Sequence, residues 1–258
     1  MKTDETNSIY PLSNGDLSNP IINYGRMYIG SYFHPNWDLI IELARSFKKL
    51  TTHKDREISH NAKVTFAAYL YCLINGIRTF EYCRLKASQI DLLSGIIPVI
   101  GKSNQVRENS RYLPLIKDSK LFSLVKTAYL ASQKCISDKA LIRHENLVSD
   151  MAFYFVVDGV IYELTVNSLQ KFLDFAADQA GINADTLFDF TKTRHLAKSS
   201  MVEFGLPSEL INAIMGHQPI GLETFSNYRD SNLLRSGLDQ YARYAHWQSN
   251  RILKSLGD

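Results

Sequence analysis

Residues 188–200, FDFTKTRHLAKSS, are the most informative stretch of this chain because they contain Arg194. Residues 214–220, IMGHQPI, follow and contain His217, and Tyr228 comes eleven residues after that histidine. Arginine presents a planar fork of donors that fits phosphate oxygens. Histidine donates a hydrogen bond near neutral pH, and a tyrosine oxygen can attack phosphorus and hold it covalently. This order of residue types indicates a site for a phosphodiester.

Two upstream stretches extend the pattern. Residues 73–92, LINGIRTFEYCRLKASQIDL, place Arg78 two positions after a glycine, and residues 99–115, VIGKSNQVRENSRYLPL, place Lys102 in a polar turn between two apolar runs. Together with TKTRH at 191–195 and LPSELINAIMGH at 206–217, these boxes resemble those of the tyrosine recombinase (phage integrase) family. The resemblance covers about residues 60–232 and depends on five boxes in the same order.

The resemblance implies a catalytic set and a reaction. The arginines would neutralise the charge that spreads over the equatorial oxygens of a phosphoryl transition state, so that neither a metal ion nor another cofactor is expected. The lysine would protonate the departing 5′ oxygen, the histidine would hold an oxygen, and the tyrosine would form a 3′-phosphotyrosine. The implied catalytic residues are Arg78, Lys102, Arg194, His217 and Tyr228, with Thr191, Glu81 and His195 as assisting residues and Glu81 as a buried partner for an arginine.

Two departures from the family pattern keep alternatives open. Thr191 stands where the family usually has His or Lys, and Tyr228 follows His217 by eleven residues where nine is commoner. Threonine is a poor acceptor for the proton of a phenol whose pKa is about 10. Tyr241 and Tyr244 are rival nucleophiles, although their spacing suits a packed helix.

Composition limits the class of protein. The chain has 258 residues, 45% of them hydrophobic, and a net charge of only +3, which permits nucleic-acid binding without requiring it. Basic clusters at 45–49, 53–56, 101–111 and 192–198 form either solvated faces or one DNA-binding face. Three cysteines without metal spacing favour a reducing compartment. We expect a cytoplasmic, nucleoid-associated protein without a signal peptide or membrane span.

The periodicity predicts a mainly α fold with a small antiparallel β-sheet, like a tyrosine recombinase catalytic domain. A hairpin is expected around Lys102, and a strand, a turn at Asp158-Gly159 and a second strand are expected near residue 158. Residues 1–57 are expected to be an arm and a short helical segment, with a reduced or missing core-binding domain, before a catalytic domain at 58–258. Helices are expected at about 36–50, 59–74, 79–87, 118–133, 139–150, 166–180, 191–204, 208–215 and 233–254.

The sequence therefore predicts a site-specific recombinase or integrase of a mobile genetic element. Its partners would be double-stranded DNA and further copies of itself, from dimer to tetramer on DNA. One alternative is a weak or inactive recombinase-like protein that binds DNA and regulates. A helical interaction module and a type IB topoisomerase are weaker alternatives. The last helix would pack either on its own domain or on a neighbouring subunit.

Overall fold

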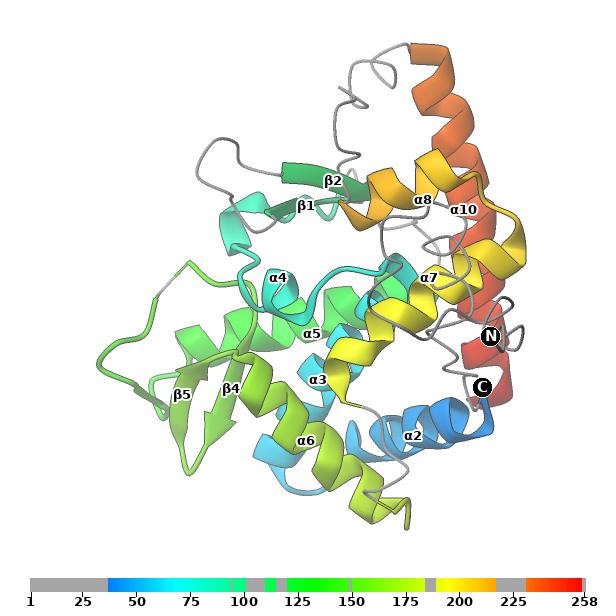
Figure 1. Ribbon diagram of the computed structural model, residues 1–258. Helices are drawn as coiled ribbons and strands as arrows, with labels where there is room; N and C mark the ends of the chain where they lie inside the picture. Colours follow the sequence, from blue (N-terminus) through cyan, green and yellow to red (C-terminus); the bar gives the residue numbers. More distant parts are fainter. Residues whose placement is uncertain are drawn as a thin grey trace, which may run out of the picture. The chain divides into compact units, whose positions relative to one another are not determined.

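The computed structural model describes residues 37–93, 95–100, 110–114, 120–148, 150–183, 189–216 and 231–256. The described elements from Trp37 onward belong to one compact unit and are mainly helical, as predicted (Figure 1). Within these ranges, no helix is both long and apolar enough to cross a membrane. The elements are α2 (Trp37–Leu50), α3 (Arg56–Asn75), α4 (Thr79–Cys83), η3 (Ala87–Gln89), β1 (Ile96–Ile100), β2 (Ser110–Pro114), α5 (Lys120–Ser137), β3 (Ile142–Arg143), β4 (Tyr154–Val157), β5 (Val160–Glu163), α6 (Val166–Gln179), η5 (Phe190–Lys192), α7 (Thr193–Phe204), α8 (Ser208–Met215), α10 (Ser231–Leu253) and η6 (Lys254–Leu256).

Helix α3 lies at the centre of the core. The Asp55 carboxylate caps its first turn by accepting from the amides of Glu57 and Ile58 at 2.8 and 3.2 Å. Almost every residue from Ser59 to Asn75 is buried, because α2, α5, α6, α7 and α10 all pack against the helix. A helix that is apolar on every side is stable only when neighbours surround it.

Helix α2 shares this core. It packs against α3 and α6, and the Ser46 hydroxyl donates to the Ala176 carbonyl of α6 at 2.6 Å. The rings of Phe47 and Phe66 stack across the α2–α3 contact. The predicted boundary at 57/58 thus falls within the first turn of α3, the helix against which α2 packs, and the boundary itself stays a prediction.

The described strands form two small sheets. Strands β1 and β2 pair antiparallel from Ile96↔Pro114 to Ile100↔Ser110, as the predicted hairpin requires. The second sheet has the order β3-β5-β4, and its β3–β5 pair is parallel. Asp158 and Gly159 both have positive φ, 51° and 74°, which gives the tight turn predicted between β4 and β5. The described part of the chain thus has one more sheet than the single small sheet of the predicted fold class.

The helix predicted at 139–150 is wrong. The Asp138 carboxylate accepts from the Ala140 amide at 2.9 Å, which turns the chain after α5. The amides of Ile142 and His144 then donate to Gly159 and Ile161 of the second sheet at 2.9 and 3.1 Å. The backbone of this segment is therefore paired with β5, which is distant in the sequence.

The helix predicted at 79–87 is shorter than expected. Helix α4 ends at Cys83, and Lys86 forms an isolated bridge to Met151. The Ala87 amide donates to Asp150 and the Ala152 amide donates to Leu85, both at 2.8 Å. Hydrogen bonds to residues 150–152 thus take the place of further helical turns after Cys83.

Candidate functional site

The end of α3 is the meeting point of the candidate site. Gly76 is the C-cap of α3 in the left-handed conformation, with φ 65° and ψ 22°. Only Ile77 separates it from Arg78, which is the N-cap of α4. The Tyr244 hydroxyl of α10 donates to the Ile74 carbonyl at 2.9 Å, so a second helix satisfies one of the last carbonyls of α3.

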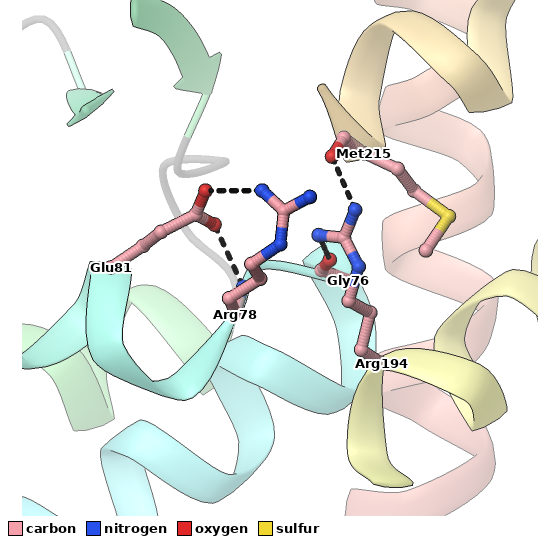
Figure 2. Close-up of polar contacts among 5 residues, drawn as sticks. All are labelled: Gly76, Arg78, Glu81, Arg194 and Met215. Atoms are coloured by element: carbon pink, nitrogen blue, oxygen red, sulfur yellow. Dashed lines mark hydrogen bonds and ion pairs between the residues drawn. The ribbon is translucent and has the colours of Figure 1, made fainter. Parts of the chain in front are cut away.

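Arg78 is held by Glu81. The Arg78 amide donates to Glu81 Oε2 at 2.7 Å, and Arg78 Nη1 donates to Oε1 at 3.1 Å (Figure 2). The Glu81 side chain is fully buried, whereas 36% of the Arg78 side chain is exposed. One carboxylate therefore fixes the backbone and the guanidinium of Arg78 together, and this is the partnership predicted for Glu81.

Arg194 is held by two backbone carbonyls. It lies in the first turn of α7, its Nη1 donates to the Gly76 carbonyl, and its Nη2 donates to the Met215 carbonyl, each at 2.6 Å (Figure 2). Met215 is the last residue of α8, and Gly216 caps that helix with φ 67°. The guanidinium thus bridges the C-terminal ends of α3 and α8.

The two arginines meet at one segment of the chain. Arg194 and its acceptor Gly76 are 118 positions apart in the sequence, and Arg78 follows that acceptor by two residues. Two guanidinium groups near each other repel, and the Glu81 carboxylate and the negative ends of two helix dipoles offset that repulsion. The charges of the arrangement are therefore largely balanced, and 36% of the Arg78 side chain is exposed, which gives an anion access to it.

The other predicted site residues are placed only in part. Lys102, His217 and Tyr228 lie outside the described residues, although β1 and β2 flank the Lys102 segment and Gly216 directly precedes His217. The backbone of Thr191 lies in η5, and its side chain is outside the description. His195 is exposed on α7, so its side chain does not pack in the core, and its assisting role stays a prediction.

The two rival tyrosines are core residues. Tyr241 is 1% exposed and Tyr244 is fully buried. Burial raises the pKa of the Tyr244 hydroxyl well above its ordinary value, and this hydroxyl is bonded to Ile74. A phenol that is both buried and harder to ionise is a poor nucleophile.

Sequence reasoning missed the acceptors that hold Arg194. They are the main-chain carbonyls of Gly76 and Met215. Because every residue has a main-chain carbonyl, residue types do not indicate which one binds an arginine. The available signal was indirect. A glycine follows both α3 and α8, and each glycine marks a helix end whose last carbonyls have no partner within the helix.

The sequence profile of the phage integrase family matches residues 45–235. The chain therefore belongs to the phage integrase family, the tyrosine recombinases, and the family resemblance of its boxes is confirmed. No curated protein sequence matches the chain.

Solved recombinase structures are distant from this chain. The XerA recombinase shares 18% identity over 78% of this chain and 62% of its own, with a TM-score of 0.48. The XerH recombinase bound to its difH substrate shares 17% identity over 78% and 51%, with a TM-score of 0.49. The lambda integrase catalytic core shares 12% over 70% and 93%, with a TM-score of 0.45. This chain thus spans only about half to two thirds of the two Xer proteins.

Proposed function

We propose that this protein cleaves and rejoins DNA strands as a site-specific recombinase through a phosphotyrosine intermediate. The observation that carries the proposal is the contact of Arg194 with Gly76, which brings two arginines from distant parts of the chain to one segment. Membership of the tyrosine recombinase family supports the same reaction.

The proposed reaction is an in-line transesterification. The Tyr228 hydroxyl loses its proton to water as its oxygen attacks the scissile phosphorus. The Tyr228 O–P bond forms, and the bond from phosphorus to the 5′ oxygen breaks. Lys102 gives a proton to the departing 5′ oxygen, which leaves a 5′-hydroxyl end and a 3′-phosphotyrosine. Because the phosphodiester energy is kept in the protein–DNA link, a 5′-hydroxyl can reverse the step on the same or another strand without ATP.

Arg78 and Arg194 provide the electrostatic part of catalysis in this proposal. Charge on the equatorial oxygens increases toward the transition state, and donors that are already fixed stabilise it without reorganising. The Glu81 carboxylate and the carbonyls of Gly76 and Met215 do the fixing. His217 would hold a further nonbridging oxygen or the tyrosine oxygen.

The partners follow from the reaction. The substrate would be double-stranded DNA, and pairs of strand exchanges need two to four copies of the chain on that DNA. One lambda integrase structure is a tetramer bound to a Holliday junction, and a comparable assembly is our proposal for this protein. The reaction would take place on nucleoid DNA in the cytoplasm.

Thr191 favours a second candidate function. The family's usual His or Lys would accept the Tyr228 proton, and a threonine hydroxyl is a poor base. A recombinase-like protein that binds DNA without cleaving it would act as a regulator. It would bind DNA with an affinity that falls steeply with salt, because binding releases counterions from phosphates.

A nicked suicide substrate tests the proposed function. When the strand end downstream of the nick diffuses away, religation fails and the covalent adduct accumulates. We expect wild type to form a protein–DNA adduct and Tyr228→Phe to form none. Tyr162→Phe is the control, because Tyr162 is an exposed tyrosine on β5, and it should react as wild type does. An adduct that persists in Tyr228→Phe contradicts the nucleophile assignment, and salt-dependent binding without any adduct supports the regulator.

A further inference from the structure

Gly76 has a backbone conformation that other residues adopt at a cost. Its φ of +65° lies in the left-handed region, where a Cβ atom collides with the following carbonyl. The residue ends α3, and its own carbonyl is then directed at Arg194 Nη1, 2.6 Å away. The torsion of this one residue therefore sets where the acceptor for Arg194 lies.

The surroundings of Gly76 are closely packed. A Cβ atom at this position would touch the Ala197 Cβ and the Met215 Cγ, both at 3.4 Å. Ala197 belongs to α7, the helix that carries Arg194, and Met215 supplies the second carbonyl that binds the same guanidinium. A Cβ atom at residue 76 would thus be in van der Waals contact with both elements that hold Arg194, and a shift of the strained peptide would be passed to them.

Two acceptors fix the plane of a guanidinium. The Gly76 carbonyl holds Nη1 and the Met215 carbonyl holds Nη2, so rotation of the group in place would break at least one bond. With both Nη groups held, one plane sets the directions of all the N–H donors of this guanidinium. A phosphate needs its donors to be aimed in advance.

We propose that Gly76 is a positioning residue for strand cleavage: its left-handed peptide and its close contact with α7 and α8 aim the Arg194 guanidinium at the scissile phosphate. This inference rests on the proposed function for its catalytic consequence. The holding of Arg194 by residue 76 can be measured without DNA.

Gly181 provides a matched control. Its φ is +68°, almost the same as that of Gly76, and a Cβ atom there would meet nothing within 4 Å. Gly181→Ala therefore introduces the same backbone strain without pressing on another element. Thermal unfolding of Gly76→Ala and Gly181→Ala shows whether both variants remain folded.

The first measurement is nuclear magnetic resonance of protein with ¹⁵N-labelled arginine. A guanidinium clamped by two carbonyls rotates slowly about its C–N bonds and gives separate Nη proton signals. The signals of Arg194 are assigned by their loss in Arg194→Lys. We expect them in wild type and in Gly181→Ala, and we expect them to merge in Gly76→Ala.

The second measurement is single-turnover cleavage of the nicked substrate. We expect Gly76→Ala to cleave about 100-fold more slowly than wild type, because a displacement of about 1 Å costs that much, while DNA affinity changes little. Gly181→Ala should cleave at nearly the wild-type rate. Equal rates in the two glycine variants, or Arg194 signals that stay separate in Gly76→Ala, overturn the inference. If wild type forms no adduct, the proposed function fails instead, and the resonance signals still decide whether Gly76 holds Arg194.

Discussion

Arg78 and Arg194 are the same residue type held in two different ways. Arg78 pairs with a buried carboxylate, whereas Arg194 bonds to two helix-end carbonyls. A carboxylate is a full negative charge, and a helix C-terminus amounts to roughly half of one. One carboxylate therefore both orients Arg78 and compensates its charge, whereas two helix ends together do the same for Arg194.

Glu81 offers a test at the residue scale. Glu81→Ala removes both acceptors of Arg78 and leaves its amide without that partner. We expect the free energy of unfolding to fall by about 1–3 kcal/mol, as for other buried groups that lose a hydrogen-bond partner. Single-turnover cleavage should fall as well, because Arg78 loses its fixed orientation.

Two further variants interpret the result. Glu81→Gln keeps one carbonyl oxygen and should lose less stability than Glu81→Ala in urea unfolding. Glu145→Ala removes an exposed carboxylate and should leave both stability and cleavage near wild type. If Glu81→Ala cleaves as fast as Glu145→Ala, then Glu81 does not orient Arg78 for catalysis.

Residue types and their order were enough to predict that Glu81 is the buried partner of an arginine, because a carboxylate and a guanidinium pair readily. The catalytic roles of Arg78 and Arg194 stay a prediction. The contact that joins the arginines could not be predicted in this way. It runs from Arg194 to a main-chain carbonyl, and only the packing of α7 on α3 brings it about.

At the scale of elements, a helix set by local sequence signals was predicted correctly, whereas a strand set by pairing with a distant segment was not. Helix α8 begins and ends as predicted, at Ser208 and Met215, because its apolar spacing and the glycine after it are local signals. Residues 139–150 were predicted to be helical and instead include β3, whose partner is β5. Helix propensity is a weak preference that such pairing overrides.

His60 makes the contact between α3 and the second sheet sensitive to pH. Its Nε2–H donates to the Tyr154 carbonyl of β4 at 2.9 Å, and its Nδ1 faces the Cys135 Sγ of α5 at 3.5 Å. Burial lowers the pKa of His60 below its ordinary value of 6.5, and the charge of Lys63 lowers this pKa further. The folded state therefore favours the neutral imidazole.

The sign of the pH effect follows from proton binding. Below about pH 6.5 the unfolded chain binds a proton at residue 60 more readily than the folded chain does, so stability is lost as the pH falls. We expect the free energy of unfolding to decrease between about pH 7.5 and about pH 5.5, and we expect His60→Gln to weaken this dependence. Urea unfolding at several pH values measures it.

An exposed histidine supplies the comparison for this experiment. His246 lies on the surface of α10, and His246→Gln should leave the pH dependence of unfolding close to that of wild type. A wild-type stability that is constant over this pH range would contradict the contribution assigned to His60. So would an equal pH dependence in wild type and His60→Gln.

At the scale of the whole described unit, α10 ties the helices around α3 together. Helix α10 contributes three buried side chains to the core, those of Tyr241, Tyr244 and Ile252. Arg251 lies 3.8 Å from the centre of the Trp37 ring on α2 and forms an ion pair with Glu203 of α7 at 2.7 Å. The described part of α10 thus packs internally, which is one of the two alternatives that the sequence left open.

Internal packing of α10 also helps to hold the candidate site. Its Tyr244 hydroxyl binds the Ile74 carbonyl, two residues before Gly76. Three helices, α7, α8 and α10, therefore meet at the end of α3, each near the segment that leads to Arg78. Such convergence of distant elements is a property of the tertiary structure and cannot be predicted from the order of residue types along the sequence.

The most direct test of the account is a crystal structure of Tyr228→Phe bound to an uncleaved DNA site. The measured quantities are the distances from the guanidinium nitrogens of Arg78 and Arg194 to the nonbridging oxygens of each phosphate. We predict that one phosphate lies within hydrogen-bond distance of both guanidinium groups, with the aromatic ring at position 228 beside it. A phosphate that contacts only one of the two arginines, or DNA bound on another face of the protein, would contradict it.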